Sequence, residues 1–356
     1  MRTVFLASTL ATLLLPACST PHAAGKSGGL EPFAPDQPYV RIVDASSNLV
    51  ELQIAVRKFV PAHAKGPALW LMGVSHIGEP GYYAQIQNRL NERTLVLFEG
   101  VGDHATVSAT ASNTCRPASG PVVQPAADEK SPPPMAAAKR SMSSLQSSLA
   151  ASLGLVFQLD AIDYSRTNFR NCDLSIAEIR RLIVEQQTAS GTDGASRSFE
   201  SLMQVMQGDG LFEILIEAGL RFIGSNPKLQ GMSKLALIEV LGQIQGDPAQ
   251  LGGLPPDLTQ VLDVLIAQRD RKVISELEAE TVPHSGIGRR DSIAIFYGTG
   301  HMPDLERRLR QELGCRPAGQ TWLTAFSVNL PQAGISRNER EFIRSFVQSQ
   351  VTVKMQ

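Results

Sequence analysis

Short apolar runs along the first third of the chain predict buried strands. Residues 39–56 alternate enough between apolar and polar positions to indicate one or two strands. Residues 68–74 (ALWLMGV) and 95–98 (LVLF) are continuous apolar runs, typical of strands buried on both faces. Residues 79–92 between them favour a helix that begins near Pro80. A strand, a helix and a strand at this spacing indicate a crossover unit of a parallel sheet.

The pattern resumes after a long polar stretch. Residues 155–162 (LVFQLDAI) suit a strand, and Ser175 with Glu178 forms a capping box before a helix. Apolar positions at spacings of three and four predict helices over 198–245 and 255–280. The pattern then predicts a strand at 293–297, a helix at 303–313, a strand at 321–328 and an amphipathic helix at 336–350. We therefore expect an α/β fold with a central, mostly parallel sheet flanked by helices and a helical insertion.

Composition divides the chain further. We expect a signal peptide at 1–17, a tether rich in Gly, Pro and Ser at 18–38, and the first half of the α/β domain at 39–103. Residues 104–145 are mainly Ala, Pro and Ser, which predicts a disordered insertion. We expect residues 146–285 to form a strand and a helical region, and residues 286–356 to form the second half of the α/β domain.

The N-terminus predicts where the protein works. One positive charge at Arg2, an apolar stretch from Val4 to Leu15 and small residues after it are typical of a signal peptide. The sequence LPAC resembles a bacterial lipobox, so Cys18 is the expected lipidation site; cleavage at an ordinary small-residue site is the alternative. Ser19 favours the outer membrane. We expect a protein of the bacterial cell envelope, anchored by lipid and facing the periplasm.

Charge and cysteine content exclude some classes. The formal net charge is -1 and aromatic residues make up 6% of the chain, so we expect no nucleic-acid partner. Apart from Cys18, the chain has Cys115, Cys172 and Cys315. Three thiols allow at most one disulfide, and the sequence does not say which two would pair.

Two Gly-x-x-His turns carry the candidate chemistry: GVSH at 73–76 and GTGH at 298–301. Each follows an apolar strand, at the carboxyl end where open α/β sheets place their ligands. Glu99 ends the strand LVLF in the same way, and a buried carboxylate needs a partner. We predict that His76, Glu99 and His301 meet at one edge and bind a divalent metal. The alternative is that they are polar residues at ordinary strand ends, wetted by solvent.

Two further segments are candidates for the same site. Arg269 falls in the apolar stripe of its helix, so its guanidinium must reach a carboxylate, a carbonyl or a substrate anion, unless it extends to the rim. Its neighbours Asp270 and Arg271 look like surface charges. Tyr164 and Arg166, in a polar segment after a strand, are candidate substrate-binding residues, although a hydrogen-bonded loop that only orders the fold is the alternative.

Taken as a set, these residues resemble the TraB/GumN/Tiki family. The resemblance consists of GVSH, Glu99 in LVLFEG, Arg269 in IAQRDRKV and GTGH, and it covers roughly residues 40–330. It implies an α/β fold shared with erythromycin esterases and haem-binding ChaN-like lipoproteins. The Tiki branch implies metal-dependent peptide cleavage, with manganese or cobalt rather than zinc. The long Ala/Pro/Ser insertion departs from the compact family pattern.

Two functions follow as hypotheses. In the first, the protein is a metal-dependent, peptidase-like hydrolase in which His76, Glu99 and His301 bind the metal. Glu99 is either a ligand or a general base, and Arg269 stabilises the oxyanion or holds a substrate carboxylate of a peptide or another small polar substrate. In the second, the same pocket binds haem or another ligand without turnover. An envelope interaction module whose site has decayed is a third, plainer reading.

Overall fold

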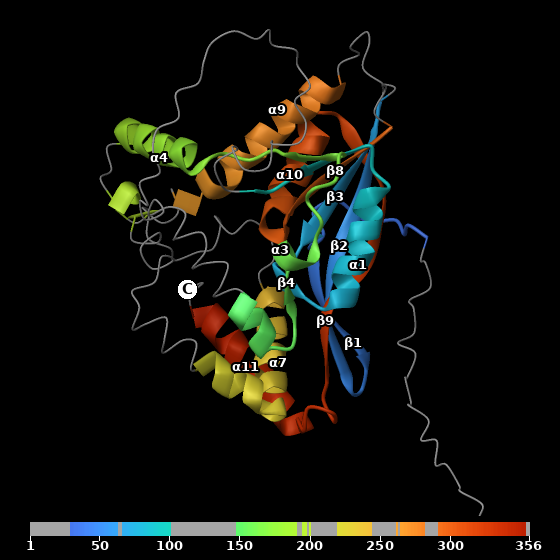
Figure 1. The fold of residues 1–356 in the computed structure, drawn as a ribbon, viewed down its shortest axis with the longest axis vertical. Coiled ribbons are helices and arrows are strands. Elements are labelled where there is room, and N and C mark those ends of the chain that lie inside the picture. Colours follow the sequence, from blue (N-terminus) through green and yellow to red (C-terminus); the bar gives the residue numbers. More distant parts are fainter. Residues whose placement is uncertain are drawn as a thin grey trace, which may run out of the picture.

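A computed structural model describes nearly all of the predicted sheet and most of the helices (Figure 1). The described residues are 29–62, 66–100, 147–190, 194–197, 199–200, 219–243, 261–262, 264–281 and 291–353. The predicted signal peptide, Cys18, Cys115 and the Ala/Pro/Ser-rich insertion lie outside them. Among the described residues, no helix has both the length and the apolar character needed to cross a membrane.

A single mixed sheet organises the molecule. Its antiparallel part is centred on β2. One edge of β2 pairs with β1, to form a hairpin, and with β3, whereas β9 pairs along the other edge. The bounds of β1, β2 and β9 are Val40–Ser46, Leu49–Pro61 and Cys315–Asn329. One or two strands were predicted over residues 39–56 and there are two, and the predicted strand at 321–328 is part of the longer β9.

The parallel part of the sheet carries the candidate chemistry. Strand β3 pairs with β8, β8 with β5 and β5 with β7, all parallel. The bounds are Ala68–Val74 for β3, Ser292–Gly298 for β8, Leu95–Phe98 for β5 and Phe169–Asn171 for β7. The predicted α/β fold is confirmed. β3 and β5 are not neighbours, because the distant strand β8 lies between them.

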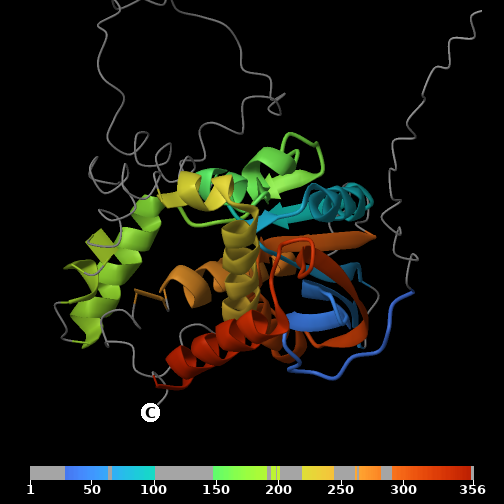
Figure 2. The same ribbon diagram turned by 90° about the horizontal axis from the view of Figure 1, so that it is seen from below.

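Helices cover both faces of this sheet because the side chains of β8 alternate between two cores. Ala294 and Phe296 lie in one core with α1, α7 and α11, whereas Ile293 and Ile295 lie in another with α9 and α10. Helices α7 and α11 also pack against each other (Figure 2). The helices are α1 (Pro80–Asn91), α4 (Ile176–Ser190), α7 (Pro227–Gln243), α9 (Arg269–Thr281), α10 (Met302–Gln311) and α11 (Arg337–Val353).

Several local predictions are confirmed and others are wrong. The capping box at α4 is present, since the Ser175 backbone N–H donates to Glu178 and the Glu178 N–H donates to Ser175 Oγ. The predicted strand at 155–162 is instead a two-residue strand β6 (Val156–Phe157) followed by the short helix α3 (Gln158–Ala161). The helix predicted over 198–245 is interrupted, within its described part, at Asn226, whose side chain caps α7.

The chain is fixed on the sheet before its expected start at Tyr39. Glu31 forms a β-bridge with Gln320 of β9, and Phe33 packs edge-on against Phe59. The last part of the predicted tether therefore belongs to the folded domain. Cys172 and Cys315 are buried free thiols, and burial raises the pKa of Cys172 to about 12 and that of Cys315 to about 11.

Candidate functional site

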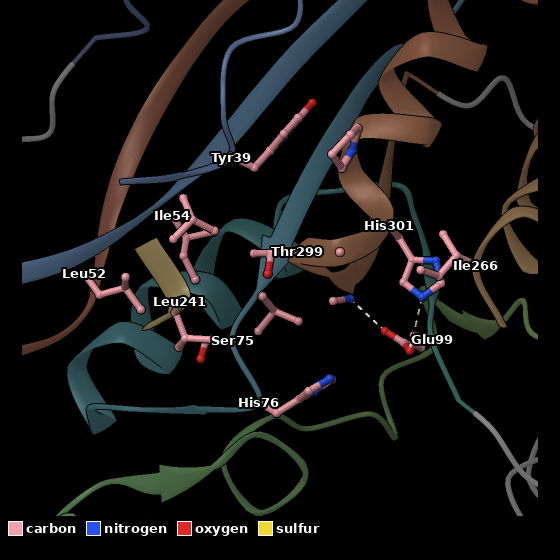
Figure 3. A pocket seen from close by; sticks show the side chains of 15 residues that line it. Tyr39, Leu52, Ile54, Ser75, His76, Glu99, Leu241, Ile266, Thr299 and His301 are labelled. Carbon is pink, nitrogen blue, oxygen red and sulfur yellow. Dashed lines mark hydrogen bonds and ion pairs between the residues drawn. The ribbon is translucent and has the colours of Figure 1, made fainter. Parts of the chain in front are cut away.

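One pocket lies at the carboxyl ends of the three neighbouring parallel strands β3, β8 and β5 (Figure 3). It has a volume of about 350 Å³ and is lined by His76, Glu99 and His301 together. His76 follows β3 and Glu99 follows β5, whereas His301 ends a short 3₁₀ turn (Thr299–His301) after β8. The prediction that the three side chains reach one edge of the sheet is confirmed.

Glu99 is held from two directions as an ionised carboxylate. Its Oε1 accepts a hydrogen bond from Arg269 Nη2 at 2.7 Å, and its Oε2 accepts one from the Gly298 backbone N–H at 2.7 Å. Burial would raise the pKa of Glu99, but Arg269 and His301 outweigh it and hold the pKa well below its ordinary value. Glu99 is therefore a fixed negative charge at the base of the pocket.

Arg269 is buried, as its place in the apolar stripe predicts. Its Nε and Nη2 donate to the two carboxylate oxygens of Asp173, each at 2.7 Å, and Nη2 is shared with Glu99. Just before it, residues Val264–Gln268 form a π-helix, a local widening that is common at functional sites. The two carboxylates raise the pKa of Arg269 despite its burial, so it is a permanent cation.

His301 has a carboxylate behind it, and this corrects the sequence reading of Asp270. Asp270 was expected on the surface, but it is fully buried and its Oδ1 lies 2.7 Å from His301 Nδ1. Arg269 and Asp270 both lie on the face of α9 that carries the buried Val273, Ile274 and Leu277, while Arg271 stays exposed. Burial alone would lower the pKa of His301, but hydrogen bonds to Asp270 and Glu99 raise it to about 9. The two carboxylates thus favour the imidazolium form of His301, whereas Arg269 Nη1, 3.3 Å from His301 Nε2, opposes it.

His76 is the exposed member of the set. Its Nδ1 lies 2.9 Å from Gln158 Oε1, and its ring points toward Glu99 across the pocket (Figure 3). An alanine Cβ built at Gly298 would lie 3.3 Å from Glu99 Oε2 and 3.5 Å from His76 Nε2. The absence of a side chain at Gly298 thus leaves open the space between the carboxylate and the imidazole.

Replacing Gly298 with alanine is expected to remove activity at little cost in stability. The φ of Gly298 is -52°, which alanine adopts freely, and the new methyl group requires its neighbours to move by only a few tenths of an ångström. The methyl nevertheless fills the space between Glu99 and His76. We expect the free energy of unfolding to change by no more than about 1 kcal/mol. Turnover, measured on the same variant, should be lost. Full activity in the folded variant would show that this space is not the reaction site.

The two candidate substrate-binding residues are not among those that line the pocket. The Tyr164 ring packs against Phe98, Phe169 and Phe296, and its hydroxyl reaches Gln158. Arg166 is exposed and pairs with Asp163 at 2.9 Å. This segment matches the alternative of a hydrogen-bonded loop, although Tyr164 contacts the site indirectly through Gln158.

A metal ion shared by His76, Glu99 and His301 does not fit this arrangement. Such an ion would need the donor atoms about 2.1 Å from one point. The Arg269 guanidinium lies against two of them: Nη2 is 2.7 Å from Glu99 Oε1, and Nη1 is 3.3 Å from His301 Nε2. A divalent ion there would face this fixed positive charge at close range. Among the described residues, no group of three His, Cys, Asp or Glu side chains is arranged to hold a metal. The manganese or cobalt ion stays a prediction, as does haem.

The rest of the pocket wall is mainly apolar. Figure 3 shows Tyr39, Leu52, Ile54 and Leu241 facing the polar group across the cavity. Its volume of about 350 Å³ lies at the lower end of the range of pockets that hold small ligands. The wall therefore favours an apolar substituent next to the bond that reacts.

Three residues of the site were missed by the sequence reasoning: Gln158, Asp173 and Asp270. Asp173 had a usable signal, because it follows β7 just as Glu99 follows the neighbouring strand β5. Gln158 had a weaker one, a polar residue at the end of an apolar run. Asp270 also had a usable signal, because it lies on the apolar stripe of α9, three positions before Val273 and seven before Leu277.

No protein-family model matches the chain, and comparisons with curated proteins and with solved structures found no match. The resemblance to the TraB/GumN/Tiki family therefore stays a prediction that rests on the motif residues alone.

Proposed function

We propose that the protein is a hydrolase of the bacterial cell envelope that cleaves an ester or amide bond, a peptide bond first among them. The observation that carries the proposal is the meeting of His76, Glu99 and His301 in one pocket, with Arg269 bonded to Glu99 behind it. His76 and His301 are two titratable groups in different surroundings, and both lie near fixed charges. Such a pair suits acid–base chemistry. The envelope location and the lipid anchor at Cys18 rest on the N-terminal sequence.

The two histidines have complementary roles in the proposed reaction. His76 Nε2, at the open side of the pocket, accepts a proton from water as the water oxygen bonds to the carbonyl carbon. His301, whose imidazolium form is favoured by Asp270 and Glu99, gives its proton to the leaving oxygen or nitrogen as the carbonyl–leaving-group bond breaks. The proton on His76 then passes to solvent and His301 is reprotonated.

Glu99 and Arg269 supply the fixed electrostatics. Glu99 Oε1 lies 3.7 Å from His301 Nε2 and favours the charged imidazolium, while Arg269 keeps Glu99 ionised and in place. Arg269 Nη1 lies beside His301 Nε2, where a positive charge stabilises an oxyanion that forms near this edge. The apolar wall accepts the side chain or acyl group next to the scissile carbonyl. The proposed reaction does not use a metal ion.

The test compares His76→Ala and His301→Ala with the parent on 4-nitrophenyl esters and fluorogenic peptides that carry apolar or charged groups. We expect each variant to lose about 10² to 10⁴ in turnover, and substrates with an apolar group to be preferred. Arg271→Ala, one residue from the site and exposed, is the matched control and should keep full activity.

The same assay is run with EDTA and with added Mn²⁺. Turnover unchanged by the chelator supports the acid–base reaction. Turnover that requires Mn²⁺ would contradict it in favour of the metal-dependent prediction. Haem uptake with no cleavage of any probe would overturn the proposal and favour the binding protein.

A further inference from the structure

We infer that Gln158 is a positioning residue that fixes His76 as the tautomer with its proton on Nδ1, so that Nε2 presents a lone pair to the pocket. The inference rests on the proposed function for its catalytic meaning, but the tautomer itself is a property of the folded chain. Three observations carry it: the strand register beside His76, the side-chain contacts of Gln158, and the contrast with His301.

The register of a small second sheet brings Gln158 next to His76. Strand β4 (Ile77–Gly78) pairs antiparallel with β6 (Val156–Phe157), and Ile77 lies opposite Phe157. The next pair outward is His76 and Gln158, whose backbone N–H donates to the His76 carbonyl at 2.8 Å. Gln158 is thus tied to His76 through the main chain as well as through its side chain.

The side chain of Gln158 is buried and bonded at both ends. Its Oε1 lies 2.9 Å from His76 Nδ1, and its Nε2 donates to the Tyr164 hydroxyl at 2.8 Å. The Tyr164 ring is packed among Phe98, Phe169 and Phe296, so the hydroxyl is held in place. An amide oxygen accepts but does not donate, and therefore the proton between the two residues belongs to His76 Nδ1. The Nε2 atom is left unprotonated in the neutral ring.

This unprotonated nitrogen faces the reaction space. His76 Nε2 lies 3.5 Å from the Cβ position of Gly298, the position that also lies 3.3 Å from Glu99 Oε2. The Glu99 carboxylate is the charged group that faces His76 from β5, and taken alone it would favour a proton on Nε2. Gln158 opposes that tautomer from the other side of the ring.

The two histidines of the pocket have different groups behind them. His301 Nδ1 is backed by the carboxylate of Asp270, which adds negative charge and favours the imidazolium. His76 Nδ1 is backed by a neutral amide, which orients the ring and adds no charge. One histidine is therefore set up as a proton donor and the other as a proton acceptor.

The experiment reads the tautomer directly, by nitrogen–proton correlation NMR of the full chain labelled with ¹⁵N-histidine. The His76 signals are assigned from their loss in His76→Ala. In the parent we expect Nδ1 to carry the proton. In Gln158→Leu we expect a mixture of tautomers and at least a tenfold loss of turnover. Gln158→Glu still accepts from Nδ1, so it should keep the parent tautomer.

Two further variants keep the test decisive. Tyr164→Phe frees the Gln158 amide to turn and should give mixed tautomers even where Gln158→Leu does not fold. Gln85→Leu, an exposed glutamine on α1 whose side chain donates to Gly81, should leave His76 unchanged. A parent His76 protonated on Nε2, or a tautomer indifferent to Gln158→Leu and Tyr164→Phe, would overturn the inference. A fixed Nδ1–H tautomer in a chain that cleaves no probe would instead refute the proposed function alone.

Discussion

Arg269→Ala is expected to lower the free energy of unfolding by about 3 to 5 kcal/mol and to abolish turnover. The reason is that Arg269 is the shared counter-ion of two carboxylates, Asp173 and Glu99, and Asp173 is fully buried. Without the guanidinium, both acids must either stay charged with no counter-ion, held by backbone N–H groups alone, or take up a proton. A protonated or displaced Glu99 no longer favours the His301 imidazolium.

Chemical denaturation followed by circular dichroism measures the first effect, and the hydrolysis assay measures the second. Arg271→Ala is the matched control, because Arg271 lies two positions after Arg269 on the same helix, is exposed and bonds only to Gln268 among its described contacts. We expect that change to cost no more than about 0.5 kcal/mol. If Arg269→Ala is as stable as Arg271→Ala, the buried charge network does not hold the site together.

The position of the site at the sheet edge was predictable because it depends on strand ends. His76, Glu99 and His301 each follow an apolar run, and the carboxyl ends of parallel strands lie at one edge whatever their order. The sequence could not specify that β8 lies between β3 and β5. That order nevertheless brings the Gly298 N–H within 2.7 Å of Glu99 and makes the three ends direct neighbours.

What the sequence could not predict depends on contacts between distant segments. Periodicity places Asp270 on the buried face of α9, but it does not show that His301 is the partner of this carboxylate. Gln158 reaches His76 through a two-residue strand pair that closes a gap of 82 positions in the chain. Such short ladders carry too few residues to show an alternating pattern. The residues that tune the site were therefore harder to find than those that form it.

The charge network also changes the chemical reading of the motif residues. Two imidazoles and a carboxylate at one edge predict a metal when only their identities are known. The contacts show that Glu99 is already neutralised by Arg269 and that His301 is already paired with Asp270. The same residues then suit proton transfer between fixed charges. Identity and spacing alone do not separate these two chemistries, because the decisive partners come from elsewhere in the chain.

A second buried ion pair supports the opposite wall of the pocket. Glu306 of α10 accepts a hydrogen bond from Arg57 Nη1 at 2.7 Å and one from the hydroxyl of Tyr39 at 2.6 Å. Arg57 is fully buried, and its guanidinium lies over the Tyr39 ring, 3.9 Å from the centroid. Because Tyr39 lines the pocket, this pair fixes a wall residue to the helix that follows His301.

Breaking this pair on one side is expected to be costly, and removing both sides is expected to cost less than the sum of the two single changes. Arg57→Met leaves Glu306 buried without its cation, and Glu306→Leu does the reverse, so each should lose about 3 to 5 kcal/mol of unfolding free energy. The double variant should be destabilised by roughly 1 to 3 kcal/mol less than the sum of the two, because no unpaired charge remains.

Denaturant titration of the four proteins gives the coupling energy of the pair. Arg310→Ala is the control, since Arg310 pairs with the exposed Asp36 and a solvent-exposed pair contributes at most about 1 kcal/mol. Additive losses in the double variant would show that Arg57 and Glu306 stabilise the fold independently. A large coupling with reduced hydrolysis in both single variants would tie the stability of this wall to the reaction, because Tyr39 loses its fixed partner in each case.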